Sequence, residues 1–240
     1  KYGSESAKQF YEMCVIDPKF ARAHREGDIH IHDLDFLTLT TTCCQIDLLK
    51  LFKGGFSTGH GFLREPNDIQ SYSALACIAI QSNQNDQHGG QSVPNFDYAL
   101  AVGVRKTYKR AYWKNLAEIL DFMYDIDDKE GLVKQIGTDI EEQYGVCPCM
   151  AWDNNYLELE AEQLKKYIPE EDIAKVQKKA VKFADEEIEK RTYQAMEALI
   201  HNLNTMHSRA GAQVPFSSIN YGTDTSPEGR LVMKSILLAT

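Results

Sequence analysis

Hydrophobic positions recur with a helical period over most of the chain, and several of these stretches begin at a typical helix start. Proline is common in the first helical turn, because it lacks an N–H and the N–H groups of that turn have no partner within the helix. Acidic residues are common there because they interact favourably with the helix dipole. Residues 4–26 predict short helices that Asp17 and Pro18 separate. Longer helices are predicted over 66–84, 94–124, 169 to beyond 201, and 226 onward.

Alternation with a period of two predicts strands instead. Residues 36–43 alternate apolar and hydroxyl side chains and are rich in β-formers, so we expect a strand there. Residues 91–93 and the end of 209–220 also predict extended backbone, whereas 27–35 is turn-rich and 125–168 predicts irregular or short helical pieces. In the first strand, one face would carry Leu37, Leu39, Thr41 and Cys43, and the other Thr38, Thr40, Thr42 and Cys44.

Two short segments resemble each other and suggest a repeated unit. Gly89–Pro94 and Gly211–Pro215 share Gly, Gln, Val and Pro positions, and each follows a predicted helix. A glycine-rich loop over 54–61 separates the first strand from the first long helix. Helices interspersed with short strands predict the α/β class, and no Pro/Gly/Ser-rich linker divides residues 1–240 into domains.

The composition is that of a globular protein with an acidic balance. The 240 residues are 43% hydrophobic and 25% charged, and 26 basic against 35 acidic residues give a net charge of −9. This balance argues against a dedicated nucleic-acid or anionic-membrane binder. A nucleotide ligand stays possible, because it needs only a local basic group or a helix N-terminus.

The chain lacks the apolar segments of membrane or secreted proteins. Its longest apolar stretch, Ala74–Ile80, is far below the roughly 20 residues of a membrane span. The N-terminus has no signal-peptide pattern. Disulfides form mainly in exported proteins, so we expect the six cysteines to be reduced thiols in a cytoplasmic protein. Because the sequence starts at Lys1 and stops at Thr240 within a predicted helix, we expect it to be a fragment.

Cys43 and Cys44 are the sharpest chemical feature. Neighbouring residues of a regular strand point to opposite faces, so we expect at most one of the two thiols to face a given cavity. Free cysteine commonly acts as a small buried hydrophobic residue, and composition alone favours this structural role for both cysteines. The alternative is a redox thiol that gives up a hydrogen atom or a proton.

A second feature is the segment HIHDLD, in which His30 and His32 alternate beside acidic residues. It could form a metal site or a polar pocket for phosphate or sugar hydroxyls, or simply a hydrogen-bonded turn. Cys147 and Cys149 have C-x-C rather than C-x-x-C spacing, so we expect no metal site in this chain.

Two loops, 83–91 and 209–213, are rich in Gly, Gln, Asn or His. Glycine allows the backbone to approach a ligand, and amides can bind base edges, although both loops could equally be ordinary turns. Neither matches a phosphate-binding loop or a dinucleotide fingerprint.

Five ordered blocks resemble the anaerobic (class III) ribonucleoside-triphosphate reductases, which are oxygen-sensitive glycyl radical enzymes. The similarity covers residues 20–235, and the blocks are HREGDIHIHDLD, TTCCQIDL, GGFSTGHGFLREP, ALACIAIQSNQNDQHGGQSVPNFDYAL and ALIHNLNTMHSRAGAQVPFSSINYGTD. The resemblance implies a ten-stranded α/β barrel of two parallel five-stranded halves. Residues 1–240 would be the N-terminal portion of that catalytic barrel domain.

Other family parts are expected outside this sequence. An ATP-cone domain would lie upstream, and the glycyl radical, the finger-loop cysteine and a zinc-binding cysteine cluster would lie beyond Thr240. We therefore expect zinc only in that C-terminal region, and we expect the fragment alone to be inactive.

The resemblance also implies the chemistry. The glycyl radical generates a thiyl radical that takes the 3′ hydrogen of the ribose, the 2′ hydroxyl leaves as water, and formate is the usual reductant. A second cysteine on the first barrel strand serves the other ribose face. The motif places it at Cys43, whereas the polar face of the predicted strand favours Cys44. His30 or His32 would help to hold the substrate.

The family further implies a homodimer, a radical-SAM iron–sulfur activase, and dNTP or ATP effectors at the dimer interface. The candidate effector-binding residues are Gln81, Gln84, Gln91, Arg105 and Lys106. Three alternatives remain: a glycyl radical enzyme of the pyruvate formate-lyase type, a non-enzymatic zinc-binding regulator built on HIHDLD and CPC, and a nucleotide-binding module without chemistry.

Overall fold

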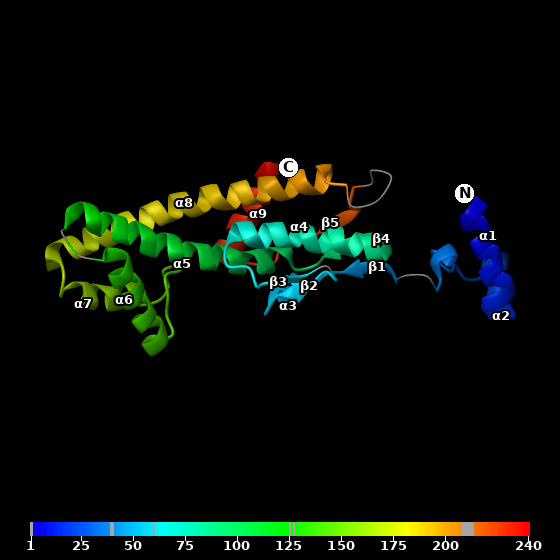
Figure 1. The fold of residues 1–240 in the computed structure, drawn as a ribbon, viewed down its shortest axis with the longest axis horizontal. Coiled ribbons are helices and arrows are strands. Elements are labelled where there is room, and N and C mark those ends of the chain that lie inside the picture. The colour runs from blue at the N-terminus through cyan, green and yellow to red at the C-terminus, as the bar shows by residue number, and fades with distance from the viewer. Residues whose placement is uncertain (1, 39–40, 60, 125, 127, 208–213) are drawn as a thin grey trace.

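Two long antiparallel helices form the axis of the molecule in the computed structural model (Figure 1). The structure describes residues 2–38, 41–59, 61–124, 126, 128–207 and 214–240. α5 (Phe96–Met123) packs along α8 (Glu170–Thr205), and α4 (Ile69–Asp86) and α9 (Pro227–Ala239) pack against the same pair. The remaining helices are α1 (Tyr2–Phe10), α2 (Pro18–Glu26), α3 (Leu48–Phe52), α6 (Lys129–Tyr144) and α7 (Tyr156–Leu164), with a π-helical turn at Tyr11–Val15 and a 3₁₀ turn at Leu34–Phe36.

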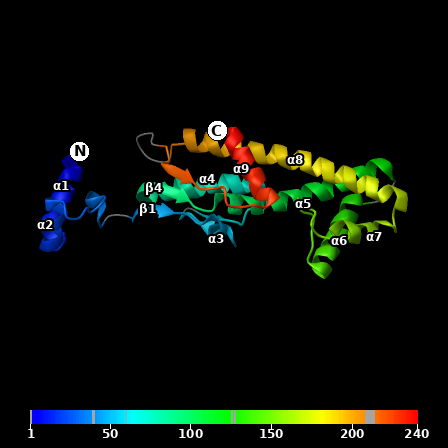
Figure 2. The ribbon, with the colours of Figure 1, turned by 180° about the vertical axis from the view of Figure 1, so that it is seen from behind.

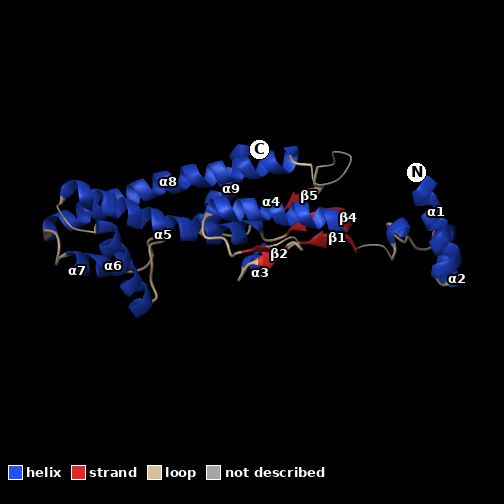
Figure 3. Cartoon of the chain, viewed as in Figure 1, coloured by secondary structure: helices blue, strands red, loops and turns tan. Residues whose placement is uncertain are grey.

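A small parallel sheet lies beside α4, where Figure 3 shows its strands in red. Its order is β1 (Thr41–Gln45), β4 (Gln87–Val93) and β5 (Ser217–Ile219). β4 leads into α5 and β5 leads towards α9, so the two strands occupy equivalent places in a helix–strand–helix succession. A separate hairpin, β2 (Phe56–Ser57) with β3 (Phe62–Leu63), follows α3.

The helix starts follow the predicted signals. Asp68 and Ser71 form a capping box on α4, because the Asp68 carboxylate accepts from the Ser71 N–H at 2.8 Å and the Ser71 hydroxyl accepts from the Asp68 N–H at 3.1 Å. Ser226 caps α9 by accepting from the Gly229 N–H at 3.1 Å. Capping satisfies N–H groups that have no partner within the helix.

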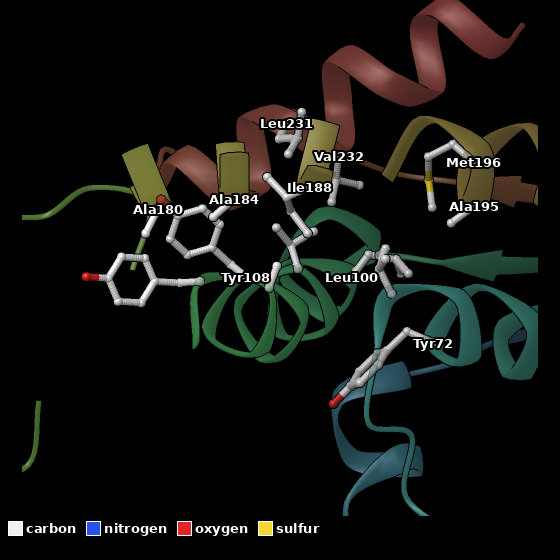
Figure 4. Close-up of a cluster of buried hydrophobic side chains, with 14 of the residues drawn as sticks. Tyr72, Leu100, Tyr108, Ala180, Ala184, Ile188, Ala195, Met196, Leu231 and Val232 are labelled. Atoms are coloured by element: carbon white, nitrogen blue, oxygen red, sulfur yellow. The ribbon is translucent and has the colours of Figure 1, made fainter. Parts of the chain in front are cut away.

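The core is built between α4, α5, α8 and α9 (Figure 4). Ala180 and Ala184 are fully buried on α8, and their small side chains allow α8 to lie close to α5. Gly103 has the same role between α5 and α4, since a Cβ there would lie 2.9 Å from the Tyr72 ring. These contacts hold α4, and with it the following strand at the centre of the sheet, in a fixed position.

The N-terminal segment, residues 2–38, lies at the opposite end of the molecule from α6 and α7, and Figures 1 and 2 show α1 and α2 apart from the helical body. Asp17 caps α2 by accepting from the Lys19 N–H at 2.8 Å. The Phe36 ring stacks on the His88 imidazole of β4 at a centroid distance of 3.8 Å. This stacking joins the segment to the sheet.

The structure confirms the α/β class and corrects four local predictions. The first strand spans Thr41–Gln45 rather than 36–43, because residues 34–36 form a 3₁₀ turn. The region 125–168 contains the regular helix α6, which Asp128 caps and which buries Val133, Ile136 and Ile140. The loop over 54–61 contains β2, and 91–93 is the end of a longer strand. Leu39, Thr40 and the 209–213 loop lie outside the described residues.

Within the part of the chain that the structure describes, none of the helices combines the length and the apolar character that a membrane span requires.

Candidate active site

An open pocket of about 470 Å³ lies across the three parallel strands. Both adjacent cysteines line it, and so does the Gly90–Ser92 part of β4. The full lining is Cys43, Cys44, Gln45, Gly90, Gln91, Ser92, Phe216, Ser217 and Ser218. The Cys44 Sγ accepts from Asn83 of α4, which does not line this pocket, so the prediction that at most one thiol faces a given cavity stays a prediction.

The pairing of β1 with β4 contains a bulge at Cys43. Thr42 pairs with His88 and Cys44 pairs with Gln91, so the single residue Cys43 opposes two residues, Gly89 and Gly90. A bulge interrupts the regular alternation of side chains and redirects the side chain opposite it. Cys43 also has φ +51°, in the left-handed region that non-glycine residues rarely adopt.

Gly89 supplies the space that Cys43 needs. Gly89 has φ +93°, and a Cβ built on it would lie 2.9 Å from the Cys43 Sγ and 3.3 Å from the Cys43 backbone nitrogen. Any other residue would therefore push the thiol out of its place. Cys43 is exposed and lies directly at the pocket.

Cys44 has a different environment, because it is half-buried and hydrogen-bonded. The Asn83 carboxamide of α4 donates to the Cys44 Sγ at 2.9 Å and to the Gln91 Oε1 at 2.8 Å. Asn83 thus ties β1 and β4 together beneath the pocket. Sequence reasoning did not single out Asn83, and its place one helical turn before the end of α4 is the signal that could have found it.

Phe216 forms the wall next to β5, and its side chain is 76% exposed. A Cβ on Gly90 would lie 3.2 Å from the Phe216 ring, so the glycine allows the ring to lie over β4. Ser217 and Ser218 continue this wall along β5. The pocket is therefore lined by two cysteines, an aromatic residue and several polar residues, which suits a ligand with both a ring and hydroxyls.

The end of β1 is fixed by Asp47. Its carboxylate accepts from the Asn95 Nδ2 at 2.9 Å and from the Lys50 N–H at 3.3 Å, which caps α3. The hydrogen bond from Asn95 holds the pKa of the Asp47 carboxyl below its usual value. Asp47 therefore links the strand that carries the cysteines to the start of α5.

His30 and His32 are exposed on the N-terminal segment, and their rings lie 5.8 Å apart. The His32 Nε2 lies 3.4 Å from Asp33, whose other oxygen lies 3.9 Å from the His88 Nε2. Neither His30 nor His32 lines the pocket. His88 is the histidine that β4 places directly before Gly89, and the sequence analysis did not select it individually.

The five predicted effector residues do not form one cluster. Gln91 lies in the cysteine pocket, whereas Gln84 is buried and donates to the Val214 carbonyl at 3.2 Å. Lys106 pairs with Glu65 at 2.7 Å, near the start of α4, and Arg105 pairs with Glu228 at 3.6 Å.

Lys106 also lies over the Tyr72 ring. Gln81 and Gln84 follow Tyr72 on α4 by nine and twelve residues, which corresponds to roughly 14 to 18 Å along the helix. The basic and amide candidates are therefore separated.

Among the described residues, no three His, Cys, Asp or Glu side chains are arranged to hold a metal ion. Cys147 and Cys149 lie between α6 and α7, and burial raises the pKa of both thiols. The Asn154 carboxamide donates to the Cys149 Sγ at 3.5 Å. The C-x-C pair is thus part of a local turn.

A family model described as anaerobic ribonucleoside-triphosphate reductase matches residues 1–240. The chain is similar to proteins of that name from Salmonella typhimurium (25% identity over 233 residues) and Escherichia coli (24% over 233), in both cases over 96% of this chain and 25% of the relative. The relative of the same name from Enterobacteria phage T4 is 26% identical over 218 residues, which are 90% of this chain and 26% of the relative. The chain spans about a quarter of the length of these relatives. Because the family model covers the chain from end to end, the chain belongs to the anaerobic ribonucleoside-triphosphate reductase family.

Proposed function

We propose that this chain is the N-terminal part of the catalytic barrel of an enzyme that reduces ribonucleoside triphosphates to 2′-deoxyribonucleoside triphosphates by glycyl and thiyl radical chemistry, with formate as the reductant. The observation that carries the proposal is the pair Cys43 and Cys44 in one open pocket across a parallel sheet. The family match over residues 1–240 favours the reductase over the pyruvate formate-lyase type.

Within this function, Cys43 is the hydrogen-donating thiol on the face of the ribose opposite the thiyl radical. It is exposed, it lies in a strained conformation opposite a bulge, and Gly89 leaves room for its sulfur. Strained backbone of this kind is concentrated at functional sites, where the surrounding structure holds it. Cys44, half-buried and bonded to Asn83, supports the site from below.

The parallel order β1-β4-β5 supports a place in one five-stranded half of the ten-stranded barrel. The glycyl radical, the thiyl-forming cysteine and the zinc-binding cysteines belong, in this proposal, to other parts of the complete enzyme. A radical-SAM activase generates the radical, and the enzyme acts as a cytoplasmic homodimer. His30 and His32 reach the substrate in the complete barrel.

Deoxynucleoside triphosphate and ATP effectors bind at the dimer interface in this proposal, with Gln81 and Gln84 as the amide candidates. Arg105 and Lys106 would have to exchange their present partners, Glu228 and Glu65, for phosphate. Gln81→Ala would then change substrate preference more than maximal rate, which an effector-by-substrate turnover matrix measures.

The test of the function is anaerobic turnover by the complete enzyme that contains this chain. The enzyme is activated with its activase, S-adenosylmethionine and a reductant, and is given a ribonucleoside triphosphate with or without formate. We expect 2′-deoxynucleotide to form only with formate, together with an equal amount of carbon dioxide. Cleavage of added pyruvate with coenzyme A to acetyl-CoA and formate, without deoxynucleotide formation, would instead identify a lyase.

A further inference from the structure

Phe216 combines a fixed backbone with an exposed aromatic ring at the wall of the cysteine pocket. Its carbonyl accepts from the Gln91 N–H of β4 at 3.0 Å, and Pro215 directly before it is buried. The residue itself is nevertheless 76% exposed, and it lines the pocket. A side chain that a rigid strand holds in the open is well placed to contact a ligand.

The ring lies on the open face of the sheet. β4 pairs with β5 through Gln91 and Ser217, so Gly90 and the residue before Ser217 lie side by side one step earlier. A Cβ on Gly90 would lie 3.2 Å from the Phe216 ring, which shows that the ring is directed to the same side as this Cβ. The ring is therefore directed over β4 and towards β1.

Cys43, Gly90 and Phe216 form one row across the three strands. Cys43 of β1 lies opposite the glycine pair of β4 at the bulge, and Phe216 follows on the other side of Gly90. Because neighbouring strands lie about 4.8 Å apart, this row is roughly 10 Å long. Gly90 has no side chain, so the middle of the row is open. A nucleoside bound along the row with its ribose beside Cys43 would bring its next group over the Phe216 ring.

The chemistry of the ring selects the base as that group, rather than the triphosphate. The face of an aromatic ring is the negative side of its quadrupole, which disfavours a triphosphate. Every nucleobase has a flat π-face that stacks on an aromatic side chain. Phe216 is the one aromatic residue among the described residues that line this pocket.

We propose that the Phe216 ring stacks on the base of the bound ribonucleotide while Cys43 acts on its ribose. The inference rests on the proposed function, which places the ribose beside Cys43. Phe216 is then a substrate-contacting residue. Because stacking uses only the flat face of the base, this contact supplies affinity without selecting among the four bases.

The test measures equilibrium Kd values in the complete, unactivated enzyme with the effector sites saturated, so that binding is separated from chemistry. The two ligands are CTP and ribose 5-triphosphate, which carries the same sugar and phosphates but no base. Phe216→Ala should raise the Kd for CTP by about fivefold to 150-fold, as the loss of one stacked base predicts. The Kd for ribose 5-triphosphate should stay at the wild-type value.

Further variants separate stacking from other roles of the side chain. Phe216→Tyr keeps the aromatic face and should keep both wild-type Kd values. Phe216→Leu keeps an apolar side chain without a π-face, and should raise the Kd for CTP alone. Phe122→Ala is the matched control and should change neither Kd, because Phe122 is 93% exposed and lies at the end of α5 farther from the sheet. Thermal melting verifies that each variant is folded.

A wild-type Kd for CTP in the folded Phe216→Ala and Phe216→Leu variants would overturn the stacking role while the enzyme still reduces ribonucleotides. An equal rise in Kd for CTP and ribose 5-triphosphate would also overturn it, because the ring would then act on the sugar or on the sheet. A wild-type enzyme that reduces no ribonucleotide would overturn the proposed function and this inference together.

Discussion

Cys43 and Gly89 face each other in backbone conformations that most residues avoid. Cys43 has φ +51° and Gly89 has φ +93°. A left-handed conformation costs a non-glycine residue roughly 1–2 kcal/mol, so the packing around Cys43 must offset this strain. Cys44, one residue further, has ordinary strand pairing with Gln91.

This difference predicts unequal roles for the two thiols. In the complete enzyme, Cys43→Ser should abolish nucleotide reduction while the fold is kept, because a serine hydroxyl does not replace a thiol as a hydrogen donor. Cys44→Ser should retain part of the turnover. Anaerobic deoxynucleotide formation measures both, and the reverse order of effects would assign the catalytic role to Cys44.

Gly89→Ala tests the space around the Cys43 thiol. The added Cβ would approach the Cys43 Sγ to 2.9 Å, and displacing a reacting group by about 1 Å can reduce kcat by about 100-fold. Gly145 at the end of α6 is the matched control, because it also has a positive φ, of +70°, but no atom lies within 4 Å of its added Cβ.

Both glycine substitutions should therefore lower the free energy of unfolding by roughly 1–2 kcal/mol through backbone strain. Only Gly89→Ala should lower kcat. Equal turnover in the two variants would show that the thiol does not depend on the space at Gly89.

At the scale of the elements, Asp97 links the start of α5 to the turn before α9. Its Oδ2 accepts from the backbone N–H groups of Gly222, Thr223 and Asp224, at 2.9 to 3.0 Å. Burial raises the pKa of the Asp97 carboxyl, but these backbone donors outweigh the effect of burial, and the pKa lies below its ordinary value. The carboxylate form is therefore the one that the fold favours.

The sign of this shift predicts a stability loss in acid. The Asp97 contribution is present above the ordinary pKa of an aspartate, near 4, and is lost as the pH falls through the lower pKa of the folded state. Asp97→Asn should lower the free energy of unfolding at pH 7 by about 1–3 kcal/mol and weaken its dependence on pH below 4. Urea denaturation measures both effects, and the exposed Asp139→Asn on α6 should change neither.

α7 is held by a buried carboxyl, Glu160, whose pKa is shifted in the opposite direction from that of Asp97. Glu160 accepts from the Tyr112 hydroxyl at 2.5 Å and from the Gln177 Nε2 at 2.9 Å. The residue is 1% exposed, and burial raises the pKa of Glu160 to about 7. Its Oε1 has no hydrogen-bond partner within the described part of the chain.

Glu160 should therefore make the chain less stable in mild base. Its contribution is fully present below the unfolded pKa of 4.5 and is lost as the pH rises through about 7. Glu160→Gln should remove this pH dependence and make the chain about 3 kcal/mol more stable than wild type at pH 8. Thermal or urea unfolding between pH 5 and pH 8 checks this, and exposed Glu162→Gln on the same helix is the control. Parallel pH profiles for wild type and Glu160→Gln would contradict it.

At the scale of the whole molecule, the soft-metal ligands are spread over separate regions. His30 and His32 belong to the N-terminal segment, Cys43 and Cys44 to the sheet, and the Cys147–Cys149 pair to the α6–α7 connection. Zinc sites in proteins commonly take four ligands of this type at one point. The arrangement of the described residues offers no such point.

Purified residues 1–240 should therefore contain no stoichiometric zinc and give no glycyl radical signal after treatment with the activase. Elemental analysis and anaerobic electron paramagnetic resonance measure the two. One zinc per chain would restore the metal interpretation of HIHDLD. A glycyl doublet would place the radical glycine within this sequence.

The sequence by itself determined the family, the α/β class and most helix positions. Start signals at Pro66–Asp68, Pro94, Pro169 and Ser226–Pro227 are local, and capping and propensity act over only a few residues. The ordered motifs identified the family before any geometry was known. The same local reasoning missed α6, whose helical period is carried by only a few apolar residues between polar ones.

Only the tertiary structure decided how the cysteines are presented. Strand alternation placed Cys43 and Cys44 on opposite faces, and the pairing of β1 with β4 set Cys43 opposite two glycines while Cys44 accepts a hydrogen bond from Asn83. The separation of Lys106 from Gln81, and the junction of Asn83 with Gln91, were equally invisible in the sequence. The Asn83–Gln91 contact spans eight residues and the Lys106–Glu65 contact spans 41, but both depend on how helices and strands pack, which no local pattern of hydrophobic and polar residues specifies.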